Sequence, residues 1–159
     1  MSDEIKIKEA QKVFETLCAA LNNRGWRFQR DDSQFTVRYG VNGDDLPMEF
    51  VFKVDAERGV LLLFSILSMN IKKEKAVEMA VAVSIINNVI VDGCFDFDIK
   101  NGRMHFRMTN SYIESIIGEE LIEYMIDCSC STVDEFNEKL MGLSSGLITL
   151  EQFVQSIGK

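Results

Sequence analysis

The sequence predicts an α+β fold in which a twisted antiparallel sheet is flanked by helices, in the order α-ββββ-α-ββ-α(α). Three observations support this prediction. Apolar residues recur with a helical period of 3.6 at both ends and in the middle of the chain. In the first half of the chain, three segments alternate between apolar and polar residues and a fourth is an apolar run. An Asn101-Gly102 turn joins two aromatic segments.

Residues 3–23 are expected to form the first helix. Its apolar positions fall on one stripe, which is the pattern of a helix that packs one face on a core. The stripe consists of Val13, Phe14, Leu17, Cys18 and Leu21. Arg24-Gly25 follows, and a cation with a C-terminal glycine is a typical helix end.

Four strands are expected next, at residues 26–29, 35–39, 48–54 and 60–67. Apolar and polar residues alternate in the first three, whereas the fourth is an apolar run after a turn. The segment between the second and third strands contains Asn42, Asp44 and Asp45 beside a glycine, which we interpret as a turn because the spacing of a calcium-binding loop is missing. The fourth strand is apolar on both faces, so we expect both to be covered, by helices or by another subunit.

Residues 73–91 are expected to form a helix with two apolar stripes. One stripe consists of Ala76, Met79, Ala80, Val83, Ile86 and Ile90, and the other of Val77, Val81, Ile85 and Val89. A helix that is apolar on two faces is expected to pack on two faces.

A hairpin is expected over residues 94–110, because Asn-Gly is the strongest signal for a two-residue turn. This turn would place Asp96 opposite Arg107 and Asp98 opposite His105, with the aromatic residues on the other face.

From Gly118 onward an acidic amphipathic pattern predicts one long or once-broken helix. After an interruption at residues 142–146, Thr149 and Gln152 have the spacing of a capping box that opens a last short helix.

Composition narrows the classes of function. The chain has 159 residues, of which 47% are hydrophobic and 26% charged, so residues 1–159 are expected to form a single ordered domain. The net charge of −8 disfavours nucleic acid and anionic membranes as partners. The N-terminus lacks an apolar signal segment and no apolar stretch approaches a membrane span, so we expect a cytoplasmic protein.

The sequence offers no convincing catalytic, cofactor or metal site, and we expect a protein that is not an enzyme. His105 is the only histidine, and its expected pairing with Asp98 explains it as part of a surface charge pair. Cys128 and Cys130 lack a second ligand pair, so the four cysteines are interpreted as reduced thiols. Glycine-rich phosphate loops and nucleophile elbows are absent from the sequence.

Three segments resemble a known family: Asn23-Arg-Gly-Trp-Arg-Phe28, the helix end Ile85-Ile-Asn-Asn-Val-Ile90 followed by Gly93-Cys-Phe-Asp-Phe-Asp98, and Gly102-Arg-Met-His-Phe-Arg107. The pattern is similar to the YbjN family, described as bacterial sensory transduction regulators with a fold like that of type III secretion chaperones. The resemblance implies an antiparallel sheet flanked by helices, no enzymatic activity, and a chaperone-like or regulatory role through protein contacts. Secretion chaperones of that fold dimerise and hold an extended stretch of a client protein.

Two functional hypotheses follow. In the first, the chain is a homodimeric protein-binding module that contacts a polypeptide through apolar sheet and helix faces. The expected contact residues are Leu61, Leu63, Met79, Val83 and Ile86. In the second, it is a small-molecule sensor or enzyme with a pocket between sheet and helix, lined by Trp26, Phe50, Phe64 and Phe97. A simpler alternative for the apolar faces is that the C-terminal helices cover them within one chain.

Overall fold

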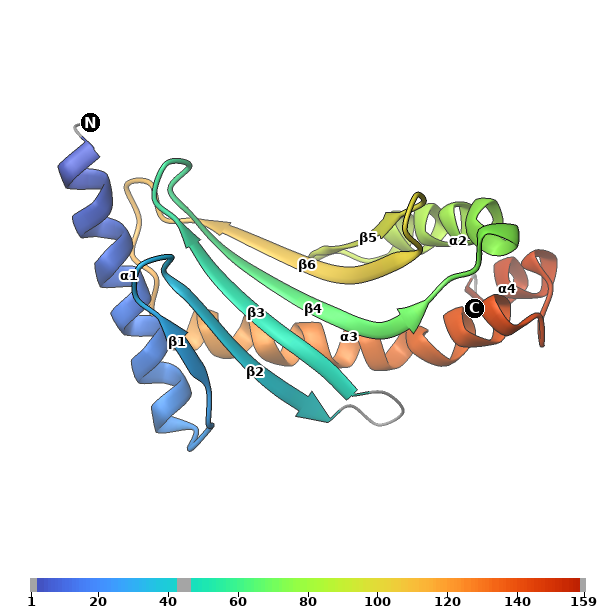
Figure 1. Cartoon of the computed structure of the whole chain (residues 1–159), viewed down its shortest axis with the longest axis horizontal. Helices are drawn as coiled ribbons and strands as arrows, with labels where there is room; N and C mark the ends of the chain where they lie inside the picture. Colours follow the sequence, from blue (N-terminus) through green and yellow to red (C-terminus); the bar gives the residue numbers. More distant parts are fainter. Residues whose placement is uncertain (1–2, 43–46, 158–159) are drawn as a thin grey trace.

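The chain folds around one six-stranded antiparallel sheet with the strand order β1-β2-β3-β4-β6-β5 (Figure 1). The structure is a computed structural model and describes residues 3–42 and 47–157. The elements are α1 (Asp3–Asn23), β1 (Gln29–Asp31), β2 (Thr36–Asn42), β3 (Pro47–Asp55), β4 (Val60–Asn70), the 3₁₀ helix η1 (Lys73–Lys75), α2 (Ala76–Val89), β5 (Cys94–Asp98), β6 (Arg103–Ser111), α3 (Glu119–Ser145) and α4 (Leu150–Ile157). The predicted α+β class and element order are confirmed. Asp44 and Asp45, where a turn was expected, lie outside the described residues.

Helix α1 forms as its pattern predicts, and the whole predicted stripe is buried. Its C-terminal end is closed by two backbone hydrogen bonds: the N–H of Gly25 donates to Asn22 O at 2.9 Å, and the N–H of Trp26 donates to Leu21 O at 3.1 Å. This is the Schellman arrangement, in which a glycine with positive φ, here +71°, reverses the chain.

The first strand was predicted at the wrong residues. Trp26 was expected to begin it, but its backbone N–H closes α1 and its ring packs on Tyr39, with the ring centroids 5.0 Å apart. Pairing with β2 begins only at Gln29, and the three residues of β1 are all exposed. The alternating apolar residues at 26–29 therefore pack against the core, and the strand β1 that follows them consists of polar residues.

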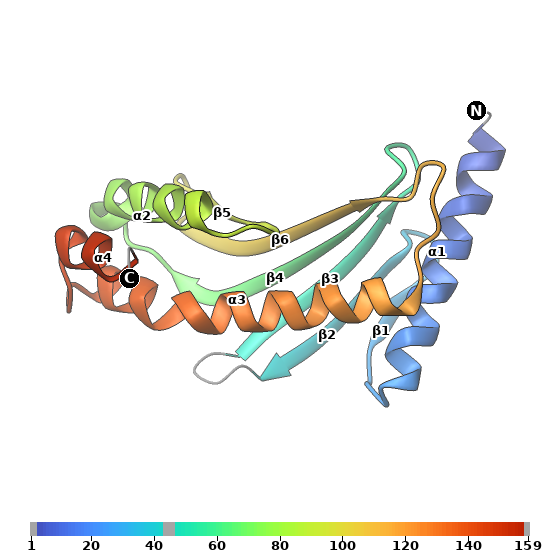
Figure 2. The same cartoon turned by 180° about the vertical axis from the view of Figure 1, so that it is seen from behind.

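The helices cover one face of the sheet. Figure 1 shows the strands in front of α1, α2 and α3, and Figure 2, from behind, shows α3 crossing in front of the strands. Burial alternates accordingly along β4, where Leu61, Leu63 and Ser65 are fully buried while Leu62 and Phe64 are only half-buried. Within residues 3–42 and 47–157, the chain thus covers one of the two apolar faces of this strand and leaves the other only partly buried. We call the other side of the sheet the open sheet face.

The middle helix also packs on one side only. Ala76, Met79, Ala82, Val83 and Ile86 are its buried residues, and they face the core. The predicted second stripe is not covered by the described residues of the chain, since Val77 is 70% exposed and Val89 is 50% exposed. The expectation that this helix packs on two faces is therefore not met within the chain.

The hairpin of β5 and β6 forms, but its predicted register was wrong by two residues. Asp96 lies opposite His105 and Asp98 lies opposite Arg103. Asp98 closes a four-residue loop in which its carboxylate accepts hydrogen bonds from the backbone N–H of Lys100 and the side-chain amide of Asn101. The carbonyl of Gly102 also accepts the N–H of Ile71 at 2.9 Å, so contacts from outside the turn help to set the register. A shift of two leaves each side chain on its predicted face.

Strand β5 is the last strand of the sheet, and its outer edge is partly occupied by a side chain. The amide of Asn87 on α2 donates from Nδ2 to Phe95 O at 2.9 Å and accepts from the N–H of Phe95 at 2.8 Å. Both backbone groups of Phe95 are thereby satisfied without a seventh strand.

The C-terminal helices form in the predicted order, but the predicted interruption at residues 142–146 begins too early. Helix α3 is one unbroken helix that includes Gly142 and ends at Gly146, whose φ of +80° is the left-handed value that favours glycine. The predicted capping box opens α4: the N–H of Thr149 donates to Gln152 Oε1 at 2.9 Å, and the N–H of Gln152 donates to Thr149 Oγ1 at 3.2 Å. Among the described residues, no helix is both long and apolar enough to cross a membrane.

Candidate functional site

The five residues expected to contact a partner are all buried inside the chain. Leu61, Leu63, Met79 and Ile86 have no exposed area, and Val83 is 7% exposed. They join the single hydrophobic cluster formed by the helices and the covered face of the sheet. Residues with so little exposed surface act as core in this fold, so a partner would have to contact their neighbours on the opposite faces of the same elements.

The outer face of α2 provides one such surface. Val77, Val81, Ile85 and Val89, which we call the α2 stripe, lie one turn apart along the helix, and Val81 is 41% exposed. Glu78 is the only charged residue among the 14 residues of this helix, and Lys75 neutralises it across a 2.9 Å ion pair. An exposed apolar stripe without net charge is typical of a protein interface.

The open sheet face provides the second surface. Its strand register aligns Arg38, Val51, Phe64 and Arg107 in one row across β2, β3, β4 and β6. The parallel row contains Lys53 beside Leu62. Apolar side chains thus occupy the centre of this face, with cationic side chains beside them.

The four aromatic residues of the pocket hypothesis do not line one cavity. Phe50 is fully buried and lies on the covered face, whereas Phe64 pairs with Val51 and therefore lies on the open face. Trp26 packs against Tyr39 of β2, while Phe97 lies on β5 at the other side of the sheet. This geometry does not support a shared pocket of these four side chains.

A polar cluster joins β5 to β6 on the open sheet face. Asp96 accepts from Nε of Arg107 at 2.6 Å and lies 3.2 Å from Nε2 of His105. The expected contact of Asp96 with a cation is confirmed, whereas the expected pairing of Asp98 with His105 is wrong because of the register shift. Burial alone would raise the pKa of Asp96, but the hydrogen bond and charge of Arg107 outweigh it and hold the pKa below the ordinary value.

This cluster fixes the hairpin and does not activate a nucleophile. Arg107 also donates to the thiol sulfur of Cys94 at 3.1 Å. Burial, and then the charge of Asp96, raise the pKa of the Cys94 thiol, so the protonated form dominates at neutral pH. A protonated thiol is a weak nucleophile and a poor metal ligand.

The other cysteines are also separate from one another. Cys128 lies 3.9 Å from the hydroxyl of Thr132, while burial raises the pKa of Cys130 to about 11. All four cysteines are free thiols. In the part of the chain that the structure describes, no three His, Cys, Asp or Glu side chains come together in a way that could hold a metal ion.

The open sheet face could have been identified from the sequence if the even-numbered residues of β4 had been chosen in place of the odd-numbered ones. Leu61 and Leu63 were selected as contact residues, although Leu62 and Phe64 have the same alternation and the same apolar character. Sequence alone does not show which face of β4 the helices cover, because both faces of the strand are apolar. On α2, the same ambiguity led to Met79, Val83 and Ile86 in place of the α2 stripe.

Comparison with known proteins supports the fold. The structure is similar to the crystal structure of YbjN from E. coli, a protein proposed to be a transcription regulator, with a TM-score of 0.57 and 14% sequence identity over 78% of this chain and 90% of that chain. No family model matches the sequence. No curated protein matches it either. At this identity, the likeness establishes a shared fold and leaves function to the site itself.

Proposed function

We propose that this chain is a non-enzymatic protein-binding module of the YbjN type, chaperone-like or regulatory, that forms a homodimer and engages a polypeptide partner. Residues 1–159 act as one domain in this proposal. The observation that carries it is the α2 stripe, in which Val77, Val81 and Val89 are exposed and Ile85 is partly buried, on a helix with one neutralised charge. The YbjN-like fold, found in a protein proposed to be a regulator, supports the same class of function.

A second copy of the chain suits the α2 stripe because of charge. Two copies with a net charge of −8 each repel one another over most of their surfaces. The α2 stripe is a region where this repulsion is weak and apolar area can be removed from water. A two-fold axis near Val81, close to the middle of the helix, would place the two stripes against each other.

The test is the mass in solution, measured by light scattering over a dilution series. Val81→Glu places a charge in the stripe at a position that is already 41% exposed, so the variant should fold. Ala19→Glu adds the same charge at an exposed position of α1 and serves as the matched control. We expect the wild type and Ala19→Glu to be dimers and Val81→Glu to be a folded monomer. A wild type that stays monomeric at every concentration, or a dimer unaffected by Val81→Glu, would contradict the proposed seam.

A further inference from the structure

The open sheet face contains a hollow with unusual charge for this chain. Its volume is about 630 Å³, and residues of β1, β2, β3 and β4 and of the β1–β2 turn line it. The charged residues of this lining are Arg30, Arg38, Lys53 and Asp31, three cations and one anion. The chain as a whole has 17 Lys and Arg residues against 25 Asp and Glu residues. The hollow is therefore cationic in an acidic protein.

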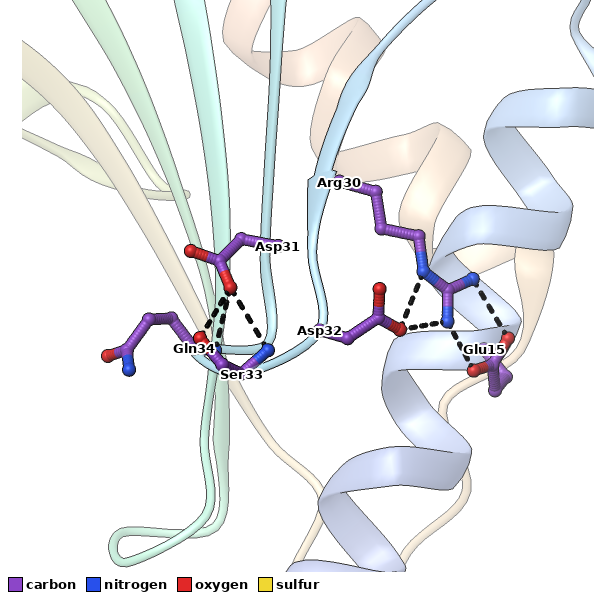
Figure 3. Close-up of polar contacts among 6 residues, drawn as sticks. All are labelled: Glu15, Arg30, Asp31, Asp32, Ser33 and Gln34. Carbon is purple, nitrogen blue, oxygen red and sulfur yellow. Dashed lines mark hydrogen bonds and ion pairs between the residues drawn. The ribbon is translucent and has the colours of Figure 1, made fainter.

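The contacts show which of these charges face the hollow. Figure 3 shows the guanidinium of Arg30 turned toward α1, where it binds Glu15 at 2.7 Å and also Asp32. The carboxylate of Asp31 points to the opposite side and accepts from the backbone N–H groups of Ser33 and Gln34 and from the Ser33 hydroxyl (Figure 3). Arg30 and Asp31 are thus held by local partners, and the hydrogen bonds to Asp31 lower the pKa of its carboxyl group.

Arg38 and Lys53 remain as the cations of the hollow. Arg38 shares one 3.2 Å ion pair with Glu49 and its side chain is still 52% exposed. Lys53 is exposed and forms no ion pair with any described residue. It lies directly across from Leu62 and next to Val51 and Phe64 in the sheet register. An ammonium group that makes no ion pair with the described residues, beside a half-buried apolar centre, is complementary to a carboxylate beside an apolar side chain.

We infer that this hollow binds a peptide segment of a partner protein in which apolar side chains are flanked by carboxylates. The apolar side chains of the segment pack on Phe64 and Ile66, which line the hollow, and a carboxylate meets Lys53, with Arg38 as a second cation. This inference rests on the proposed function and specifies the chemistry of its partner. Single-stranded nucleic acid is the less favoured occupant, because Glu49 and Asp96 share this face and the net charge is −8.

The inference is tested by fluorescence anisotropy with two labelled 12-residue peptides. Both contain the same leucine and phenylalanine residues, and they differ only in having Glu or Lys at the flanking positions. The protein variants are Lys53→Glu and, as the matched control, Lys100→Glu, which makes the same charge change at an exposed position in the β5–β6 loop. A labelled single-stranded oligonucleotide of mixed sequence is titrated in parallel.

We expect the wild type and Lys100→Glu to bind the Glu peptide about fivefold more tightly than the Lys peptide, the scale of one exposed ion pair. Lys53→Glu should abolish or reverse this preference. Equal affinity for the two peptides, no binding of either, an unchanged preference in Lys53→Glu, or tighter binding of the oligonucleotide would overturn the inference. Self-association is measured separately with Val81→Glu, so failure of the hollow is distinguishable from failure of the α2 seam.

Discussion

Gly93 is a position where a single added methyl group should disturb the fold clearly. Its φ is +74°, and a Cβ at this position would overlap Cζ of the fully buried Phe106 and lie 2.9 Å from the carbonyl oxygen of Arg107. The left-handed backbone costs a non-glycine residue about 1 kcal/mol, and overpacking in a filled core adds about 1–3 kcal/mol. Gly93→Ala should therefore destabilise the protein by about 2–4 kcal/mol.

Gly25→Ala provides a control that separates the two effects. Gly25 has a similar φ of +71°, but a Cβ there would meet nothing within 4 Å. This substitution should cost only the backbone term, about 1 kcal/mol. The difference between the two variants measures the steric conflict with Phe106 and the Arg107 carbonyl.

Urea unfolding followed by circular dichroism gives both free energies, provided that the unfolding slopes agree. In the double variant Gly93→Ala with Phe106→Leu, the smaller side chain should relieve part of the conflict, so the two costs should be less than additive. Equal costs for Gly93→Ala and Gly25→Ala, or strict additivity with Phe106→Leu, would refute the packing described around Gly93.

Three further predictions concern separate parts of the structure. Val83→Glu places a carboxylate in the core, at a position that is 7% exposed, so it should abolish the cooperative unfolding transition. Val81→Glu on the same helix should retain this transition. Equal stability of the two variants in urea would contradict the orientation of α2. Thr149→Ala removes the hydroxyl that accepts the N–H of Gln152 and should cost about 1 kcal/mol; thermal unfolding checks this, and no change in stability would mean that the capping box contributes nothing. Because Asp96 has a lowered pKa in the fold, its contribution is complete above the ordinary value of 3.8 and is lost as the pH falls through the folded-state pKa. The stability difference between wild type and Asp96→Asn, measured by urea unfolding from pH 7 to pH 3, should therefore shrink toward low pH, and a constant difference would argue against the Arg107 contact.

Local patterns were sufficient to predict most of the elements. The period of α1 and the Thr149 capping box depend on residues close together in the chain, and the structure has them where the sequence indicates. The β5–β6 register was not predictable in this way. The Asn101-Gly102 signal was outweighed by the side chain of Asp98 and by the contact between Gly102 and Ile71, which is distant in sequence.

The surfaces were harder to predict than the elements. Both faces of β4 and of α2 are apolar. Sequence periodicity shows that each face is apolar but does not show which of the two is buried. The choice is made by helix α3 and its neighbours, which lie on one side of the sheet. The cationic hollow depends on contacts between residues far apart in the sequence, because Arg30 binds Glu15 on α1 while Lys53 forms no ion pair with any residue that the structure describes.

The contact of Asn87 with Phe95 also changes what the β5 edge of the sheet offers to another chain. An exposed strand at the end of a sheet is a template on which identical chains can stack without limit. The side-chain amide of Asn87 binds both the N–H and the carbonyl of Phe95, in the middle of the β5 edge. A residue of an incoming strand would bind the same two groups, because a peptide group also has a donor and an acceptor. The backbone groups of Phe95 are therefore not available to an incoming strand at this edge.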